Sequence, residues 1–277
     1  MAIPVFTYLY DDKLQANGVV VTASSTIAES SPNNVLHPHL GIDWRSNAVS
    51  ECGLFFDMGS AITMNTWYLV GTNRMLASIG AYYKLFAHTS YLGSTLGSWA
   101  GADYNGVFSN DGTYKERYNL YHFLSSSQTK RYWAVFQVDA APPAGYTTVI
   151  VPRAFAGVRT SLAKMCDERP VETPKHIRNL VKSEAGQKFG ALINRQRTMS
   201  YNFTDMEHQD RKLLQVLFDE VGDYQPFISH LENTGSLWAY DNSILYGSFT
   251  DPSLPFNYTN ISASNLSTLR MNLEEAL

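Results

Sequence analysis

Two histidines separated by one proline, His37 and His39, are the side chains in this sequence whose types and spacing best suit a metal ion. Residues two apart in an extended segment lie on the same side of the chain, so both imidazoles would face one ion. No acidic or cysteine partner accompanies them, and Pro38 is typical of a turn. We favour a histidine pair in a turn and keep a metal site as the alternative.

Calcium and zinc sites find less support. Asp103 and Asp111 lie in a stretch rich in Gly and Asn, but without the D-x-D-x-D-G spacing of a calcium loop, so turn chemistry is the better interpretation. Cys52 and Cys166 lie far apart and form no C-x-x-C motif, which excludes four-cysteine zinc sites. We expect two buried, inert thiols without a disulfide, and we predict no metal and no cofactor.

Catalytic motifs are missing from the sequence. It contains no G-x-S-x-G, no G-x-G-x-x-G after a strand, no phosphate-binding P-loop and no H-E-x-x-H. A glycan-processing enzyme would need a pair of carboxylates at a cleft, and we can nominate no such pair. We therefore predict that the protein is not an enzyme.

The composition indicates wide neutral surfaces. The 277 residues carry 21 Lys and Arg against 25 Asp and Glu, which argues against a nucleic-acid partner because phosphate neutralisation supplies most of that affinity. Charged residues make up 17% and aromatic residues 13%, which suits burial against protein partners or an aromatic-rich β core. No apolar run of about 18 residues and no secretory leader are found, so we expect no membrane insertion and assembly in a host cytoplasm.

The first 157 residues are expected to be β throughout. Short runs rich in Val, Phe, Tyr and Trp alternate with Gly, Asn and Ser clusters, and this spacing favours a sandwich or jelly roll. The clearest strand candidates are residues 18–22, 54–57, 66–70, 82–87 and 131–138.

This region resembles the discoidin, or F5/8 type C, domain, which is a galactose-binding-like jelly roll. The residues that carry the resemblance, in order over about residues 15–157, are Thr22–Ser25, Trp44–Ser46, Leu54–Gly59, Lys84–Ala87 and Arg131–Phe136. Within it we expect Trp44 to be buried and Arg45 to satisfy carbonyls of the preceding loop.

The resemblance implies that ligands meet loops at one end of the sandwich. Those loops would hold His37, His39, Asn73 and Arg74. Three further aromatic residues lie in a Gly-rich insertion and are candidates for stacking on sugar rings or for anchoring a protein neighbour. They are Trp99, Tyr104 and Tyr114.

Residues 158–181 are charged, contain two prolines and are expected to form a connector. Residues 182–277 are expected to form an α+β assembly domain with one amphipathic helix over 205–221. Thr204 and Glu207 have the spacing of a capping box at its start, and Gly222 suits a left-handed residue at its end. Its predicted packed face consists of Met206, Leu213, Leu214, Leu217, Phe218 and Val221.

The C-terminal region is similar to a tail-tube-like barrel module of tailed-bacteriophage tail and baseplate proteins. The similarity rests on residues 182–186, 197–203, 217–218 and 222–227. The module implies ring building through strand edges and long loops. In distal tail proteins the ring-building barrel usually comes first and the sandwich second, and this sequence departs from that order.

Two functions follow from these resemblances. The first is a structural component of a phage tail, in the tail tip, baseplate or distal tail region. It would form a ring through the C-terminal domain, would carry the jelly roll as an accessory, and would reside in the virion. Its partners would be copies of itself and other tail proteins. The alternative is a carbohydrate-binding attachment protein that recognises host-surface glycans.

Overall fold

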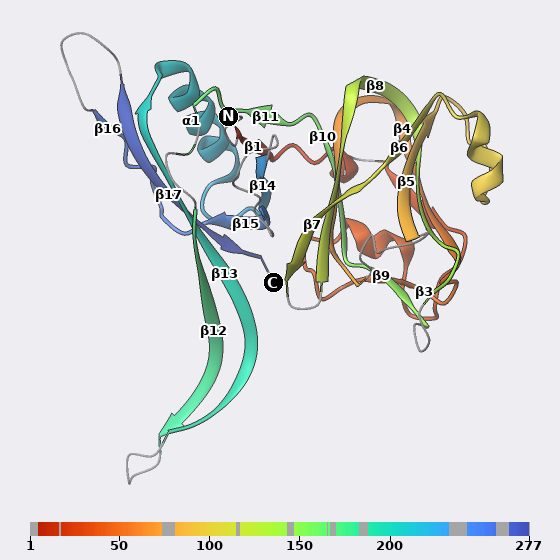
Figure 1. Cartoon of the computed structure of the whole chain (residues 1–277), viewed down its shortest axis with the longest axis horizontal. Coiled ribbons are helices and arrows are strands. Elements are labelled where there is room, and N and C mark those ends of the chain that lie inside the picture. The colour runs from red at the N-terminus through yellow and green to blue at the C-terminus, as the bar shows by residue number, and fades with distance from the viewer. Residues whose placement is uncertain are drawn as a thin grey trace. The chain divides into compact units, whose positions relative to one another are not determined.

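The chain folds into two compact units in a computed structural model (Figure 1). The structure describes residues 5–16, 18–73, 81–114, 117–142, 147–164, 166, 170–182, 188–232, 243–258 and 266–276. The terminal unit comprises Met1–Tyr10, Ser161–Ala239 and Leu245–Leu277, and the inserted unit comprises Asp11–Thr160 and Tyr240–Ile244.

The inserted unit is a β-sandwich built on two long strands. Strands β4 (Glu51–Thr72) and β8 (Arg117–Asp139) pair along most of their length and bend where their register shifts. The larger sheet has the order β10-β4-β8-β5-β6, with β2 beside β4 and β7 beside β8, and a two-stranded sheet pairs β3 with β9. The remaining strands are β2 (Val20–Ala23), β3 (Trp44–Ser46), β5 (Ala81–His88), β6 (Tyr104–Val107), β7 (Ser109–Tyr114), β9 (Val149–Val151) and β10 (Arg153–Gly157). Three short 3-10 helices complete the unit, at Lys13–Gln15, Pro32–Leu36 and Leu96–Gly101.

Strand β4 is buried on both of its faces. Leu54, Phe56 and Met58 belong to the main core between the sheets, where the Phe56 ring lies 5.1 Å from that of Trp67. Phe55 points to the opposite face, because successive side chains of a strand alternate. There it packs in a second cluster with Trp99, from the 3-10 helix Leu96–Gly101, and with Phe136. The strand candidates 54–57, 66–70, 82–87 and 131–138 lie within β4, β5 and β8, and the candidate 18–22 overlaps β2, which begins at Val20.

The loop around Trp44 is fixed as the resemblance implies, except for Arg45. Trp44 is buried and its Nε1 donates to Thr26 Oγ1 at 3.2 Å. Arg45 instead pairs with Asp43, with Nε 2.7 Å and Nη2 3.2 Å from the two carboxylate oxygens. An acidic side chain two residues away is a better partner for a guanidinium than loop carbonyls, because the ion pair adds charge to the hydrogen bonds.

The terminal unit is an open sheet covered by one helix. Its strand order is β11-β1-β14-β15-β17-β13-β12, with β16 beside β17. The strands are β1 (Val5–Leu9), β11 (Thr160–Ser161), β12 (Val171–Lys182), β13 (Lys188–Met206), β14 (Phe227–Glu232), β15 (Ile244–Phe249), β16 (Asn257–Tyr258) and β17 (Ser267–Glu275). The mainly β fold with one packed helix is confirmed, and the sheet that was compared with a tail-tube-like barrel is not closed. Among the described strands the sheet ends at β11 and β12, which do not pair with each other.

The first strand belongs to the terminal unit, although residues 1–157 were expected to form one domain. β1 pairs with β14 in a register from Val5↔Glu232 to Leu9↔Ile228. The Phe6 ring is buried at 5.0 Å from that of Tyr201. The inserted unit therefore interrupts the terminal unit in sequence. The sequence of a five-residue strand does not indicate which sheet the strand joins, because its pairing depends on residues that are distant in sequence.

Helix α1 spans His208–Val221, and Gly222 follows it with a φ of +59°, as predicted. The predicted capping box is not formed, because Glu207 is the N-cap and makes no side-chain capping bond. Met206 is the last residue of β13 and not a helix residue. Leu214 and Leu217 are buried, whereas Leu213 is 36% exposed and lies outside the packed face. The helix is thus rotated slightly from the face that periodicity alone predicted.

The predicted connector contains most of β12. Strand β12 pairs antiparallel with β13 from Val171↔Ser200 to Lys182↔Lys188. Strand β17 pairs with β13 only from Thr198 to Met206, so beyond this point β12 and β13 continue as a two-stranded ribbon (Figure 1). We call residues 173–197 of this hairpin the β12–β13 ribbon.

Candidate functional site: an aromatic pocket on the inserted unit

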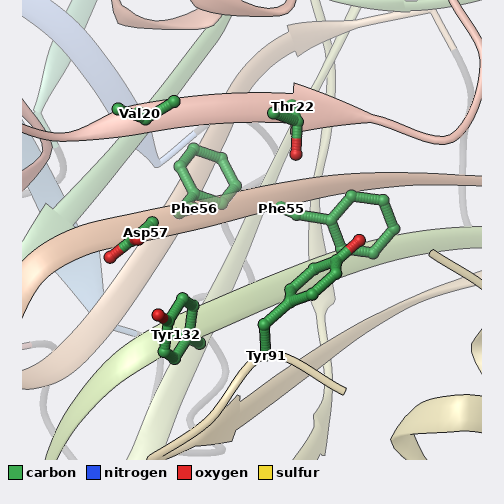
Figure 2. A pocket seen from close by; sticks show the side chains of 7 residues that line it. All are labelled: Val20, Thr22, Phe55, Phe56, Asp57, Tyr91 and Tyr132. Atoms are coloured by element: carbon green, nitrogen blue, oxygen red, sulfur yellow. The ribbon is translucent and has the colours of Figure 1, made fainter. Parts of the chain in front are cut away.

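A pocket of about 370 Å³ opens on the outer face of the larger sheet (Figure 2). It is formed by β2, β4, β8 and the loop that follows β5. Its lining residues are Val20, Thr22, Phe55, Phe56, Asp57, Tyr91 and Tyr132. All of them belong to the inserted unit.

Strand register brings the floor of the pocket together. Asp57 of β4 is paired with Val20 of β2 on one side and with Tyr132 of β8 on the other. Two residues further along β2, Thr22 is paired with Phe55 of β4. Cross-strand partners share a face of a sheet, so these five residues form two adjacent rows on the outer face. The three strands that supply them are far apart in sequence.

Aromatic rings form the wall of the pocket. Tyr91 is 48% exposed, and its ring lies edge-on to Phe55 at 5.8 Å and at 6.2 Å from Tyr132. Behind them, Trp99 stacks on Phe55 at 6.4 Å and its Nε1 donates to the carbonyl of Gly93 at 2.8 Å. The wall therefore rests on a buried indole and offers Tyr91 to solvent.

A two-pronged ion pair holds the edge of the pocket. Arg131 Nε and Nη2 donate to the two oxygens of Asp57 at 2.8 and 2.9 Å, and the Gly59 amide donates to the same carboxylate at 2.9 Å. The Arg131 guanidinium lies 4.9 Å from the ring centre of Tyr132. Hydrogen bonding to Arg131 lowers the pKa of Asp57, and hydrogen bonding to Asp57 raises the pKa of Arg131. Asp57 is therefore an ionised carboxylate. It holds the Arg131 guanidinium, which in turn lies against the Tyr132 ring.

The chemistry of the lining is that of a binding surface with one carboxylate. Asp57 is the one carboxylate among the residues that line the pocket, and its pKa is lowered, whereas a general acid needs a raised one. Thr22 and Tyr91 are exposed and carry hydroxyl groups. Exposed rings beside neutral hydroxyls favour an uncharged ligand with one apolar face.

The predicted histidine pair lies elsewhere in the inserted unit. The rings of His37 and His39 are 6.0 Å apart, and His37 Nδ1 accepts a hydrogen bond from the His39 amide at 3.1 Å. Across the described part of the chain, no group of three or more His, Cys, Asp or Glu side chains could hold a metal ion. The two imidazoles form a local turn.

Asn73 is occupied by structural contacts. Its Nδ2 donates to the carbonyl of Thr148 at 2.9 Å, and its Oδ1 accepts from the amide of Ile150 at 2.8 Å. Both ends of the amide thus fasten the residue after β4 to the segment around β9. Arg74, which was predicted beside it, lies outside the described residues.

Of the three predicted aromatic residues, Trp99 and Tyr104 have described side chains, and each is held by contacts within the protein. Trp99 is fully buried, so it supports the pocket wall and offers no stacking surface itself. The Tyr104 hydroxyl lies 2.6 Å from Nε2 of His122, and burial raises the pKa of Tyr104 and lowers that of His122. Tyr114 is in β7, and its side chain lies outside the described residues.

The remaining candidates for ligand chemistry are explained by protein contacts. Asp103 accepts from Lys130 at 2.6 Å, and the side chain of Asp111 lies outside the described residues. Cys52 and Cys166 are both buried, as predicted, and burial raises the pKa of Cys52 to about 12. In the described residues, no helix is long and apolar enough to span a membrane.

Sequence reasoning missed the pocket although its motif was in view. The run Leu54–Gly59 was noted for its family likeness, but strand alternation divides it between two faces. The available signal was this alternation, which places Phe55 and Asp57 on the face opposite to Leu54, Phe56 and Met58. A tyrosine in the loop after the next strand, Tyr91, completes the pocket. The partners on β2 and β8 could not be found, because register was unknown.

No protein-family model matches the sequence, and no curated protein is similar to it. Solved structures resemble about half of the chain. A family 29 fucosidase from Ruminococcus gnavus has 11% identity and a TM-score of 0.38 over 55% of this chain and 28% of its own. The family 32 carbohydrate-binding module of AlyQ has 18% identity and a TM-score of 0.35 over 50% of this chain and 92% of its own. A family 32 module from Clostridium perfringens has 11% identity and a TM-score of 0.34 over 53% of this chain and 98% of its own.

None of the three is described as a phage tail protein. The chain spans little more than a quarter of the fucosidase. With TM-scores below 0.5 they carry no argument about a ligand, and the function is therefore argued from the pocket itself.

Proposed function

We propose that the inserted unit binds carbohydrate, with one sugar residue seated in the aromatic pocket. The observation that carries this proposal is the half-exposed Tyr91 ring beside Tyr132, in a pocket of about 370 Å³. Such a volume falls in the range of small-molecule sites.

The chemistry of the lining fits a sugar ring. A pyranose has an apolar C–H face and a rim of hydroxyls, and tyrosine supplies a flat apolar ring with a polar tip. The hydroxyls of Thr22 and Tyr91 are placed to meet the rim, and the apolar faces of Val20 and Tyr91 are placed to meet the ring. The Asp57–Arg131 pair keeps Tyr132 in position without adding net charge.

Binding by the full chain to a glycan array, followed by calorimetry with the best ligands, tests this proposal. Tyr91→Ala is the disabling variant, and Tyr224→Ala is the matched control, because Tyr224 is 77% exposed in the terminal unit. Loss of binding in the first variant and not in the second is the expected result. Equal binding by both variants, or no binding by the parent chain, would contradict the proposal.

A second candidate function is a structural component of a phage tail that assembles through the terminal unit and resides in the virion. The β12–β13 ribbon favours it. A two-stranded ribbon is marginally stable alone in water and offers free strand edges to a neighbour. Electron microscopy of the purified chain tests this function. Rings or tubes of fixed symmetry are expected, and a chain that stays monomeric at all concentrations would contradict it.

A further inference from the structure

The row of residues along one side of the aromatic pocket continues onto strand β5. Val20, Asp57 and Tyr132 are paired one after another across β2, β4 and β8 (Figure 2). Tyr132 is paired in turn with His88 of β5. Cross-strand partners share a face of a sheet, so His88 lies on the outer face beside Tyr132. It is not among the residues that line the pocket, and it therefore lies beyond Tyr132 as seen from the pocket.

One ring nitrogen of His88 is held by the protein and the other is not. Nδ1 accepts a hydrogen bond from the Ser90 amide at 2.9 Å and lies 3.0 Å from the Ser90 carbonyl oxygen. An amide N–H can only donate, so neutral His88 carries its proton on Nε2. Nε2 lies 3.6 Å from Oδ1 of Asp103, which is too long for a hydrogen bond, and it has no hydrogen-bond partner in the described part of the chain. The side chain is 21% exposed, so Nε2–H is a donor that a ligand can reach.

Asp103 supplies an acceptor beside this donor. Its carboxylate accepts from Lys130 Nζ at 2.6 Å and from the Thr89 amide, and hydrogen bonding to Lys130 lowers the pKa of Asp103. An ionised carboxylate has about four acceptor positions, so about two remain open. The side chain is 38% exposed, and Lys130 balances its charge, which favours an uncharged partner over a cation. We call His88, Asp103 and Lys130 the His88 cluster.

A donor and an acceptor that lie side by side without bonding to each other match two neighbouring hydroxyls of a sugar. Each hydroxyl can donate one hydrogen bond and accept others, so one can accept from His88 Nε2 while its neighbour donates to Asp103. Strand β8 lies between β4 and β5, which places Asp57 and His88 two strand spacings apart, about 10 Å. The Tyr132 side chain stands between them. A ligand that reaches both the pocket and the His88 cluster therefore has more than one sugar residue.

We propose that the His88 cluster is a second subsite and that the inserted unit binds an oligosaccharide of at least two neutral sugar residues. One residue lies against Tyr91 in the pocket, and the next, beyond Tyr132, meets His88 and Asp103. This inference rests on the proposed carbohydrate binding and names the class of ligand. A monosaccharide in the pocket leaves the cluster to water, so it binds more weakly than a chain that extends from it.

Isothermal calorimetry of the full chain with matched mono- and disaccharides tests the subsite. The probes are glucose with cellobiose, galactose with lactose, mannose with mannobiose, and N-acetylglucosamine with chitobiose. The parent is expected to bind at least one disaccharide about tenfold more tightly than its monosaccharide, because two further hydrogen bonds form. His88→Ala is expected to reduce this ratio to about one, since only the second sugar residue contacts His88.

A control variant and a second cluster variant accompany His88→Ala. His39→Ala is the matched control, because His39 is an exposed histidine of the same unit outside the cluster, and it is expected to keep the parent's ratio. Asp103→Ala removes the acceptor and carries the same expectation as His88→Ala. Thermal unfolding shows whether each variant is folded, and Asp103→Ala replaces a His88 variant that is not.

The outcomes separate the subsite from the proposed function. A parent that binds a monosaccharide and its disaccharide equally overturns the subsite and leaves sugar binding in the pocket standing, and so does a His88→Ala variant that keeps the parent's ratio. A His88→Ala variant that loses both probes alike would assign His88 to the pocket itself and would also overturn the subsite. A parent that binds none of the probes, and nothing on the glycan array, contradicts both proposals.

Discussion

Arg153 and Asp12 form an ion pair in the interior of the inserted unit. Nη2 of Arg153 lies 2.5 Å from Oδ2 of Asp12, and both side chains are almost completely buried. Arg153 Nη1 also donates to the carbonyl of Leu36, and the amide of Ala156 donates to Asp12 at 3.1 Å. The pair therefore joins the start of the unit to strand β10.

The first prediction is a pH-dependent stability that Asp12 causes. Burial raises the pKa of Asp12 from 3.8 to about 6, although Arg153 acts against this rise. Because the pKa of Asp12 is higher in the folded than in the unfolded state, Asp12 contributes its full stabilisation of the folded state below about pH 4. This stabilisation is lost as the pH rises through about 6. The loss amounts to at most about 3 kcal/mol.

Denaturant unfolding of the parent and of Asp12→Asn between pH 4 and 7 checks this. Tryptophan fluorescence reports mainly on the inserted unit, which contains four of the five tryptophans, Trp44, Trp67, Trp99 and Trp133. The fifth, Trp238, belongs to the terminal unit. As the pH rises from 4 to 7, the free energy of unfolding of the parent is expected to fall relative to that of the variant. A stability difference that does not change with pH would contradict the assignment.

The second prediction separates the exposed tyrosine of the pocket from its buried support. Tyr91→Ala removes a ring that a bound sugar would cover, and burial of this apolar area contributes about 2 kcal/mol to binding. Glycan binding is therefore expected to weaken tenfold or more, with the free energy of unfolding unchanged. Trp99→Ala leaves a cavity and is expected to cost about 3–5 kcal/mol of unfolding free energy. Calorimetry and denaturant unfolding of both variants measure the two effects. An equal loss of stability in both would show that Tyr91 is also structural.

The third prediction concerns the acid limit of glycan binding. Arg131 holds the pKa of Asp57 below its usual value, so the ion pair is present above about pH 4 and is lost as the pH falls through the lowered pKa. Binding is expected to be constant from about pH 8 down to about pH 4 and to weaken only as the pH falls through the lowered pKa of Asp57. Asp57→Asn is expected to bind more weakly at neutral pH and to lose this acid limb. A variant with the parent's profile would show that the ion pair does not position Tyr132.

The fourth prediction concerns a close approach of backbone to a side chain. A Cβ on Gly106 would collide with Nε2 of His122 and crowd the hydroxyl of Tyr104. Gly106→Ala is therefore expected to break the Tyr104–His122 hydrogen bond and to cost about 1–3 kcal/mol. Gly97→Ala is the control, because no atom lies within 4 Å of the position that its Cβ would take, and it is expected to change stability by less than about 0.5 kcal/mol. Thermal unfolding of both variants measures the difference.

Local patterns were sufficient where a physical rule acts over a few residues. Gly222 ends α1 because glycine enters the left-handed region without a Cβ clash. Residues 197–203 alternate in type along β13, and the large side chains Met199, Tyr201 and Phe203, which share one face of the strand, are all buried. The capping box failed because strand β13 continues to Met206 and includes Thr204, so that Glu207 becomes the N-cap of α1.

The site shows why the rest needed the three-dimensional fold. Trp99 was nominated as an exposed platform because tryptophan in a Gly-rich loop suits stacking, but Phe55 and Phe86 supply a buried surface for it. Tyr91 is exposed for the converse reason, since it lies at the outer rim of the same cluster.

By itself, the sequence determined a mainly β chain with one amphipathic helix, two buried thiols and no catalytic motif, because periodicity and motif spacing are local properties. The tertiary structure alone decided that β1 joins the terminal unit, that the sheet stays open, and that Val20, Asp57 and Tyr132 meet in one row. Pairing and register depend on side chains far apart in the chain, and their energies are settled only when the whole core is packed.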